Sequence, residues 1–78
     1  NNLGITLFYD GRTDDALRTL NEGVAANLEH QRIWLTLGYV NSQLGNTDKA
    51  REALTRATQT GGDPSIREAA MEMLAELP

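Results

Sequence analysis

The residues that could support catalysis are few, and they lie far apart in the chain. His30 is the only histidine among 78 residues, and there is no cysteine. A metal site needs three or more converging ligands, and a disulfide needs cysteine, so neither is predicted. Asp14 and Asp15 form a pair of carboxylates. They fall where a helix is expected to begin, and acidic residues favour the first turn of a helix because of its dipole.

Short catalytic motifs are missing as well. Gly61-Gly62 is followed by neither Lys-Ser nor Lys-Thr, so it predicts a turn rather than a phosphate-binding loop. No nucleophile elbow, metalloprotease helix or dinucleotide fingerprint occurs. We therefore expect a protein that is not an enzyme, with no catalytic residue, no cofactor and no metal ligand.

The composition is that of a small globular domain with an acidic balance. The chain is 40% hydrophobic and 23% charged, and its net charge is −4. Nonspecific binding to nucleic acid needs a basic face, so we expect no nucleic-acid partner. No apolar run approaches the roughly 20 residues of a membrane span, so no membrane insertion is expected. The charge is uneven: residues 1–30 and 63–78 each carry −3 and residues 31–62 carry +2, which we interpret as solvated surface.

The strongest signal in the chain is an internal repeat. When the sequence is shifted by 34 residues, Leu3-Gly4 aligns with Leu37-Gly38, and further identities follow in the same register. These are Gly11 with Gly45, Thr13 with Thr47, Asp14 with Asp48, Ala16 with Ala50, and Leu20 with Leu54. A fixed period of this length is the mark of a stack of helical hairpins.

Each copy has the pattern of a helix, a short turn and a second helix. Apolar residues recur at steps of three and four over residues 31–44, which predicts the first helix of the second copy. Gly45 is expected to end it in the left-handed conformation, and Asn46 or Thr47 to cap the next helix, which runs to about residue 60. The equivalent helices of the first copy are expected over residues 1–10 and about 14–26.

A last helix is expected over about residues 64–77, after the break at Gly61-Gly62. Two starts fit the sequence. Asp63 could cap the helix with Pro64 at the first helical position, or Ser65 and Glu68 could form a capping box.

The glycine at position 38 needs an explanation, because a glycine inside a helix lowers helix stability by about 1 kcal/mol relative to alanine. Its counterpart in the first copy is Gly4, and Ala16 and Ala50 recur in the second helices. We interpret these small residues as points where two helices approach closely. Trp34 is expected to lie between adjacent repeats.

The pattern resembles the tetratricopeptide repeat, and the matches cover about residues 1–64. Matching positions in the second copy are Trp34, Leu37, Gly38, Gly45, Ala50, Leu54 and Ala57, and those in the first are Leu3, Gly4, Gly11, Ala16 and Leu20. The departures are Leu28 where proline is usual, Asn41 where tyrosine is usual, Gly23 at the last alanine position, leucine where phenylalanine is usual, and Pro64 two residues past the closing position, which Gly62 occupies. Helical repeats of slightly longer period are the nearest alternative, and the 34-residue shift argues against them.

The resemblance implies an all-α fold, a right-handed α-α superhelix or solenoid. It implies a single domain over residues 1–78, with a first repeat over about 1–30, a second over about 31–64 and a capping helix over about 64–77. The first repeat is expected to be truncated at its start, because the opening residues fall inside the repeat pattern.

The resemblance also implies a function, which is binding of a peptide or partner protein in a concave groove lined by the first helix of each pair. The expected groove residues are Ile5, Tyr9, Arg32, Leu35, Thr36, Tyr39, Gln43, Ala70 and Met73, with Phe8, Ile66 and Ala69 nearby. Packing against the adjacent helix is the alternative for each of them; it is favoured for Phe8 and Ile66, and the groove is favoured for Tyr39. Arg32 could contact a carboxylate.

Two further points bear on partners. One subclass of the family holds chaperone tails through a clamp of Lys, Asn and Arg; Asn1, Ile5, Thr36, Ile66 and Ala70 stand at those positions, so this ligand class is not expected. The alternative function is a structural segment of a longer solenoid, which could form a homodimer through apolar faces at its open ends.

Overall fold

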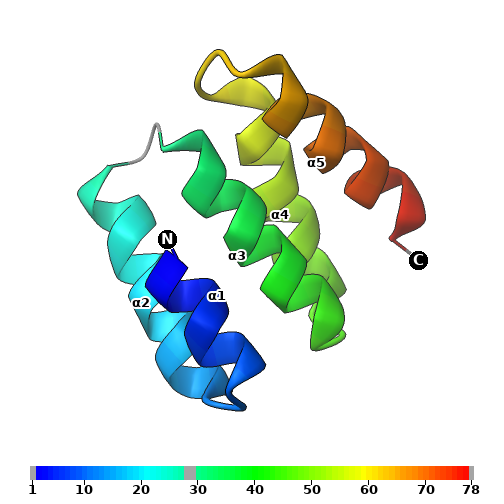
Figure 1. Ribbon diagram of the computed structural model, residues 1–78. Helices are drawn as coiled ribbons and strands as arrows, with labels where there is room; N and C mark the ends of the chain where they lie inside the picture. The colour runs from blue at the N-terminus through cyan, green and yellow to red at the C-terminus, as the bar shows by residue number, and fades with distance from the viewer. Residues whose placement is uncertain (1, 28–29, 78) are drawn as a thin grey trace.

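The chain folds into a bundle of antiparallel helices. The computed structural model describes residues 2–27 and 30–77. Asn1 and Leu28, which the sequence analysis compared with the family pattern, lie outside the described residues. Within the described residues there are five helices (Figure 1): α1 (Asn2–Tyr9), α2 (Thr13–Ala26), α3 (Gln31–Gln43), α4 (Thr47–Gln59) and α5 (Pro64–Glu76). The all-α prediction is confirmed.

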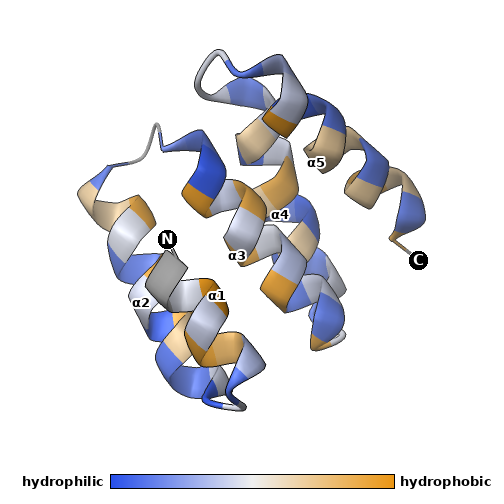
Figure 2. Cartoon of the chain, viewed as in Figure 1, coloured by the Kyte–Doolittle hydropathy of each residue, from blue (hydrophilic) through white to orange (hydrophobic). Residues whose placement is uncertain are grey.

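The helices form two unequal layers. Helix α3 packs against both α1 and α5, and α1, α3 and α5 run in the same direction (Figure 1). We call the surface that these three helices form the first-helix face. On the other side, the described residues of α2 and α4 do not pack directly on each other. The turns between helices are mainly hydrophilic, whereas α1 is apolar or weakly polar from Gly4 to its end (Figure 2).

Two turns of the same geometry close α1 and α3. Gly11 and Gly45 have φ angles of 83° and 79°, in the left-handed region that only glycine adopts at little cost. The amide of Gly11 donates to the Phe8 carbonyl at 3.1 Å, and that of Gly45 donates to the Ser42 carbonyl at 3.2 Å. The predicted left-handed cap at Gly45 is confirmed, and the same turn recurs 34 residues earlier in the chain.

The starts of α5 and α4 differ in how their caps are formed. The Asp63 carboxylate accepts a hydrogen bond from the Ser65 amide at 2.9 Å, with Pro64 opening α5, so the first of the two predicted starts is the one formed. Asn46 occupies the N-cap of α4 without a side-chain bond to that helix. Its amide instead donates to the Asn41 side chain at 3.2 Å.

Close approach between helices centres on Gly38. A Cβ atom added there would lie 2.5 Å from Cγ and Cδ2 of Leu54, which is fully buried. At Gly4 it would lie 2.6 Å from Cδ2 of Leu20. The prediction that these glycines mark close approaches is confirmed, although the side chain that fills the space is a leucine.

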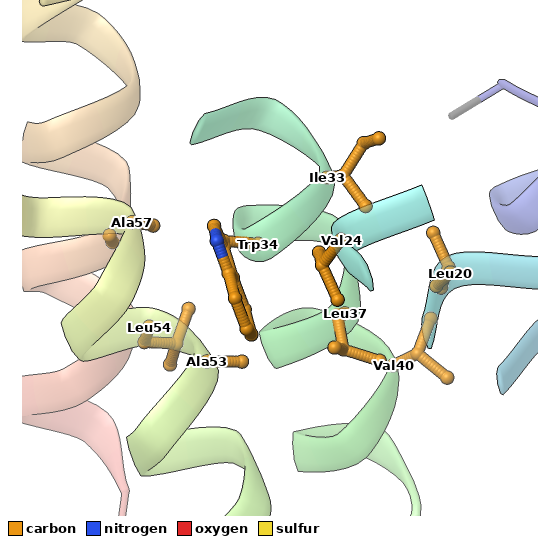
Figure 3. Packing of buried hydrophobic residues seen from close by; sticks show 10 residues of the cluster. Leu20, Val24, Ile33, Trp34, Leu37, Val40, Ala53, Leu54 and Ala57 are labelled. Atoms are coloured by element: carbon orange, nitrogen blue, oxygen red, sulfur yellow. The ribbon is translucent and has the colours of Figure 1, made fainter. Parts of the chain in front are cut away.

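Trp34 links the two helix pairs. Its ring lies between Ala53 and Ala57 of α4 and Val24 of α2 (Figure 3), and only 8% of the residue is exposed. The guanidinium of Arg56 lies 5.8 Å from the ring centroid, within the range of a cation–π contact. The tryptophan therefore lies between neighbouring helix pairs, as predicted.

Gln31 ties the start of α3 to the last two helices. Its buried side-chain amide donates to the Ala57 carbonyl at 3.0 Å and to the Asp63 carbonyl at 3.3 Å, and its oxygen accepts from the Asp63 amide at 3.1 Å. Gly61 passes so close that an added Cβ would lie 2.6 Å from the same oxygen. These hydrogen bonds of Gln31 fix the loop that leads into α5.

Replacing Gly38 by alanine tests the close approach. The substitution gains about 1 kcal/mol of helix propensity, but the new methyl group must displace buried Leu54, and overpacking typically costs about 1–3 kcal/mol. We expect Gly38→Ala to lower the free energy of unfolding by roughly 1 kcal/mol, measured by urea denaturation followed by circular dichroism. The control is Gly62→Ala, where an added Cβ meets nothing within 4 Å. A Gly38→Ala protein as stable as the wild type would contradict the expectation.

Candidate functional site

Three aromatic rings meet where the C-terminal turns of α1 and α3 lie side by side. Phe8 and Tyr39 are edge to face, with centroids 6.1 Å apart and an interplanar angle of 81°. The rings of Tyr9 and Phe8 have centroids 5.6 Å apart, and the Tyr9 hydroxyl is 3.4 Å from that of Tyr39, longer than the usual hydrogen bond between two hydroxyl groups. Tyr9 is 68% exposed, whereas Phe8 and Tyr39 are half-buried. The rings cover the junction of α1 and α3.

A hollow opens on the other side of Tyr39, between α3 and α5. Its volume is about 330 Å³, near the lower end of the range for ligand sites. We call it the α3–α5 hollow. It is lined by Tyr39, Ser42 and Gln43 of α3 and by Met73, Glu76 and Leu77 at the end of α5.

The hydroxyl groups of Ser42, which lines the hollow, and of Thr36, which lies one turn earlier, are bonded within α3. Ser42 donates to the Tyr39 carbonyl at 2.7 Å, and Thr36 donates to the Arg32 carbonyl at 3.1 Å. The hydrogen bond with Tyr9 raises the pKa of Tyr39 above its ordinary value of 10.0, and burial and the charge of Tyr9 when ionised raise it further. Tyr39 therefore stays a neutral phenol throughout the physiological range.

The repeated turns, the repeated glycine–leucine contacts and the face of parallel helices together describe a helical repeat protein. A family model described as tetratricopeptide repeat matches residues 1–65. The chain belongs to the tetratricopeptide repeat family. Members of this family are, in general, protein–protein interaction modules. Comparison with curated proteins and with solved structures gives no match.

Some residues predicted to line the tetratricopeptide groove lie together. Tyr39, Gln43 and Met73 line the α3–α5 hollow, and Tyr9 lies next to it through its contact with Tyr39. The hollow also includes Ser42, Glu76 and Leu77, which the sequence analysis did not single out. The signal was present, because Ser42 follows Tyr39 by three residues, and Glu76 and Leu77 follow Met73 by three and four, which places them on one helical face.

The other predicted residues lie away from the hollow. Ile5 and Leu35 are half-buried and pack against the core. Thr36 is half-buried, and Arg32 is exposed near the start of α3. Ala70 is fully buried in the core, so it offers no surface to a partner and has no place in the contact surface. Its position on α5 faces the core because α5 packs on both α3 and α4.

A second depression lies on the opposite side, between α2 and α4. It has a volume of about 270 Å³ and is floored by Trp34, Leu37 and Asn41 of α3. The Asn41 amide already donates to the Leu37 carbonyl at 3.0 Å, and its oxygen accepts from Asn46. These polar atoms stabilise α3 and its turn.

Two of the residues considered for catalysis, His30 and Asp15, have structural partners. The amide of Ile33 donates to Nδ1 of His30 at 3.3 Å, so His30 caps α3, a role that the sequence analysis missed. Asp15 pairs with Arg12 at 2.8 Å and Arg18 at 2.6 Å. Over residues 2–27 and 30–77, no three side chains of metal-ligand type gather in one place. No helix in the same residues has the length and apolar character to cross a membrane.

The tyrosine pair gives a titration that can be checked. Replacing Tyr9 by phenylalanine removes the largest cause of the raised pKa of Tyr39, so we expect the pKa of Tyr39 to fall toward 10.0. Because the raised pKa disfavours ionisation in the folded state, wild-type stability should decline as the pH rises above about 10, and less so in Tyr9→Phe. Tyrosinate absorbance follows the titration, since Tyr39 is then the only tyrosine. Tyr39→Phe reports Tyr9 alone. An unchanged or higher pKa of Tyr39 in Tyr9→Phe would contradict the expectation.

Proposed function

We propose that the chain is a non-enzymatic module that binds a peptide or a partner protein on the first-helix face. In this proposal an apolar side chain of the partner enters the α3–α5 hollow, between Tyr39, Met73 and Leu77. The observation that carries the proposal is the hollow itself, which combines apolar walls with the polar rim of Ser42 and Gln43. Pockets of this kind receive the anchor residues that supply most of the affinity in protein interfaces.

The scarcity of charge on α1 and α3 supports the proposal. From Gly4 to Tyr9, α1 carries no charged side chain, and Arg32 is the only charged residue of α3. Interface centres are depleted in charged residues and enriched in aromatic residues, methionine and arginine. Phe8, Tyr9, Tyr39 and Met73 give this face the same character.

Self-association is the alternative, and one observation favours it. Met71, on α5, is 57% exposed, and the neighbouring Leu74 is only partly buried. A helical repeat buries such a face against its next neighbour. In this alternative the chain is a structural segment whose α5 stacks on a second helical unit.

Glutamate substitutions in the hollow test the proposed binding. Burying an unpaired carboxylate in an apolar contact costs about 2 kcal/mol or more, which exceeds a tenfold loss of affinity. We expect Tyr39→Glu and Met73→Glu each to release partners that the immobilised wild-type chain captures from a lysate of its source organism, with a loss of at least tenfold. Met71→Glu is the matched control, because it places the same charge on the same helix outside the hollow. Circular dichroism must show unchanged helix content. If both hollow variants keep the wild-type partners, the binding site lies elsewhere.

Sedimentation velocity tests the alternative. If the chain associates through α5, the wild type should show a concentration-dependent dimer, and Met71→Glu should remain monomeric because it buries a charge in the contact. Met73→Glu, inside the hollow, should associate as the wild type does. A wild-type chain that is monomeric at every concentration would rule the alternative out.

A further inference from the structure

Two helix ends on the first-helix face carry charges that oppose the helix dipole. In α2 and α4 the charges follow the helix dipole: acidic residues such as Asp14 and Asp48 lie in the first turns, and Arg56 lies in the last turn of α4. In α3 and α5, both wholly described, the first turn holds no acid and the last turn no base, although the Asp63 carboxylate caps the start of α5. Arg32 instead lies in the first turn of α3, and Glu76 ends α5.

Glu76 is therefore in a position that is unfavourable for its own helix. The C-terminal end of a helix carries the partial negative charge of its unpaired carbonyl groups, so a carboxylate there is repelled and a cation is stabilised. Among the described residues, Glu76 forms no ion pair and no side-chain hydrogen bond. Local departures from a structural preference are expected where function requires them.

The geometry adds a second negative source at the same place. The hollow lies between the C-terminal turn of α3, at Ser42 and Gln43, and that of α5, at Met73 and Glu76. Both helices point the negative ends of their dipoles toward this region, and neither has a basic side chain in its last turn to offset them. Glu76 is the only charged residue among those that line the hollow. An apolar hollow with an unneutralised negative rim is complementary to a ligand that is apolar and cationic.

We propose that the partner segment presents a large apolar side chain to the α3–α5 hollow and, directly beside it, a lysine or arginine that pairs with Glu76; this inference rests on the proposed function. The apolar side chain packs against Tyr39 and Met73, and the cation lies at the rim near the C-terminal ends of α3 and α5. The ligand has the opposite charge to the carboxylate tails that a Lys, Asn and Arg clamp would hold.

A random dodecapeptide library displayed on phage tests this inference. The library is selected in parallel on the wild-type chain, on Glu76→Lys and on Glu72→Lys. Glu72 is exposed on the same helix, one turn before Glu76 and outside the hollow, so it is the matched control. Lysine at position 76 suits a helix C-terminus, so Glu76→Lys should be at least as stable as the wild type, and any loss of binding is not a loss of fold.

We expect the wild type and Glu72→Lys to enrich peptides in which Lys or Arg adjoins a large apolar residue, and Glu76→Lys to lose this preference. The best peptide, synthesised and titrated, should bind Glu76→Lys at least tenfold more weakly than the wild type. Its affinity for the wild type should fall as salt is added, because exposed ion pairs are screened. The affinity of the same peptide for Glu76→Gln should fall less as salt is added than its affinity for the wild type does.

The outcomes separate this inference from the proposed function on which it rests. If selected peptides need Met73, as shown by loss of binding in Met73→Glu, but carry no excess of basic residues or bind Glu76→Lys equally well, the charge inference is overturned and binding in the hollow stands. If no peptide is enriched, or if Met73→Glu binds all of them unchanged, binding in the hollow fails and the charge inference fails with it.

Discussion

The contact between Gly38 and Leu54 is the constraint on which the rest of the structure depends. Leu54 is fully buried and lies where a side chain on residue 38 would have to be, so α3 and α4 can approach only because that position is glycine. The same contact joins Gly4 to Leu20 in the first helix pair. Two hairpins with the same internal spacing can stack in the same way, which sets α1, α3 and α5 side by side and leaves α2 and α4 apart.

Helix α3 carries this arrangement because it touches every other helix. Trp34 fills the space toward α2 and α4, and the Gln31 side chain is hydrogen-bonded to Ala57 and to Asp63 in the loop before α5. The opposite side of α3 carries Tyr39, which meets α1 through Tyr9 and borders the hollow toward α5. The proposed binding surface and the core are thus two faces of one helix, and the packing of the core holds Tyr39 in place.

The features that depend on residue type and local spacing could be predicted from the sequence. The period of 34 can be read directly, and the left-handed Gly45 and the Asp63 cap, one of two starts that the sequence offered for α5, follow from what a residue can adopt or accept locally. The hydrogen bonds of Gln31 and the pairing of Tyr9 with Tyr39 could not, because each joins residues about 30 positions apart whose approach depends on how whole helices pack. The prediction for Ala70 failed for the same reason. The helical period shows which residues share a face of α5 with Ala70, but only the packing of α5 on its neighbours decides that Ala70 is buried.

The direction of the helices also determines the polarity of the first-helix face. Because α1, α3 and α5 run in the same direction, their dipoles add rather than cancel, with positive ends near Arg32 and negative ends near the hollow. Arg32 and Glu76 strengthen this polarity at the expense of their own helices, whereas the charges of α2 and α4 stabilise theirs. An antiparallel pair on the same face would have no net direction. The stacking that Gly38 permits therefore supplies both the hollow and the direction of the dipoles beside it.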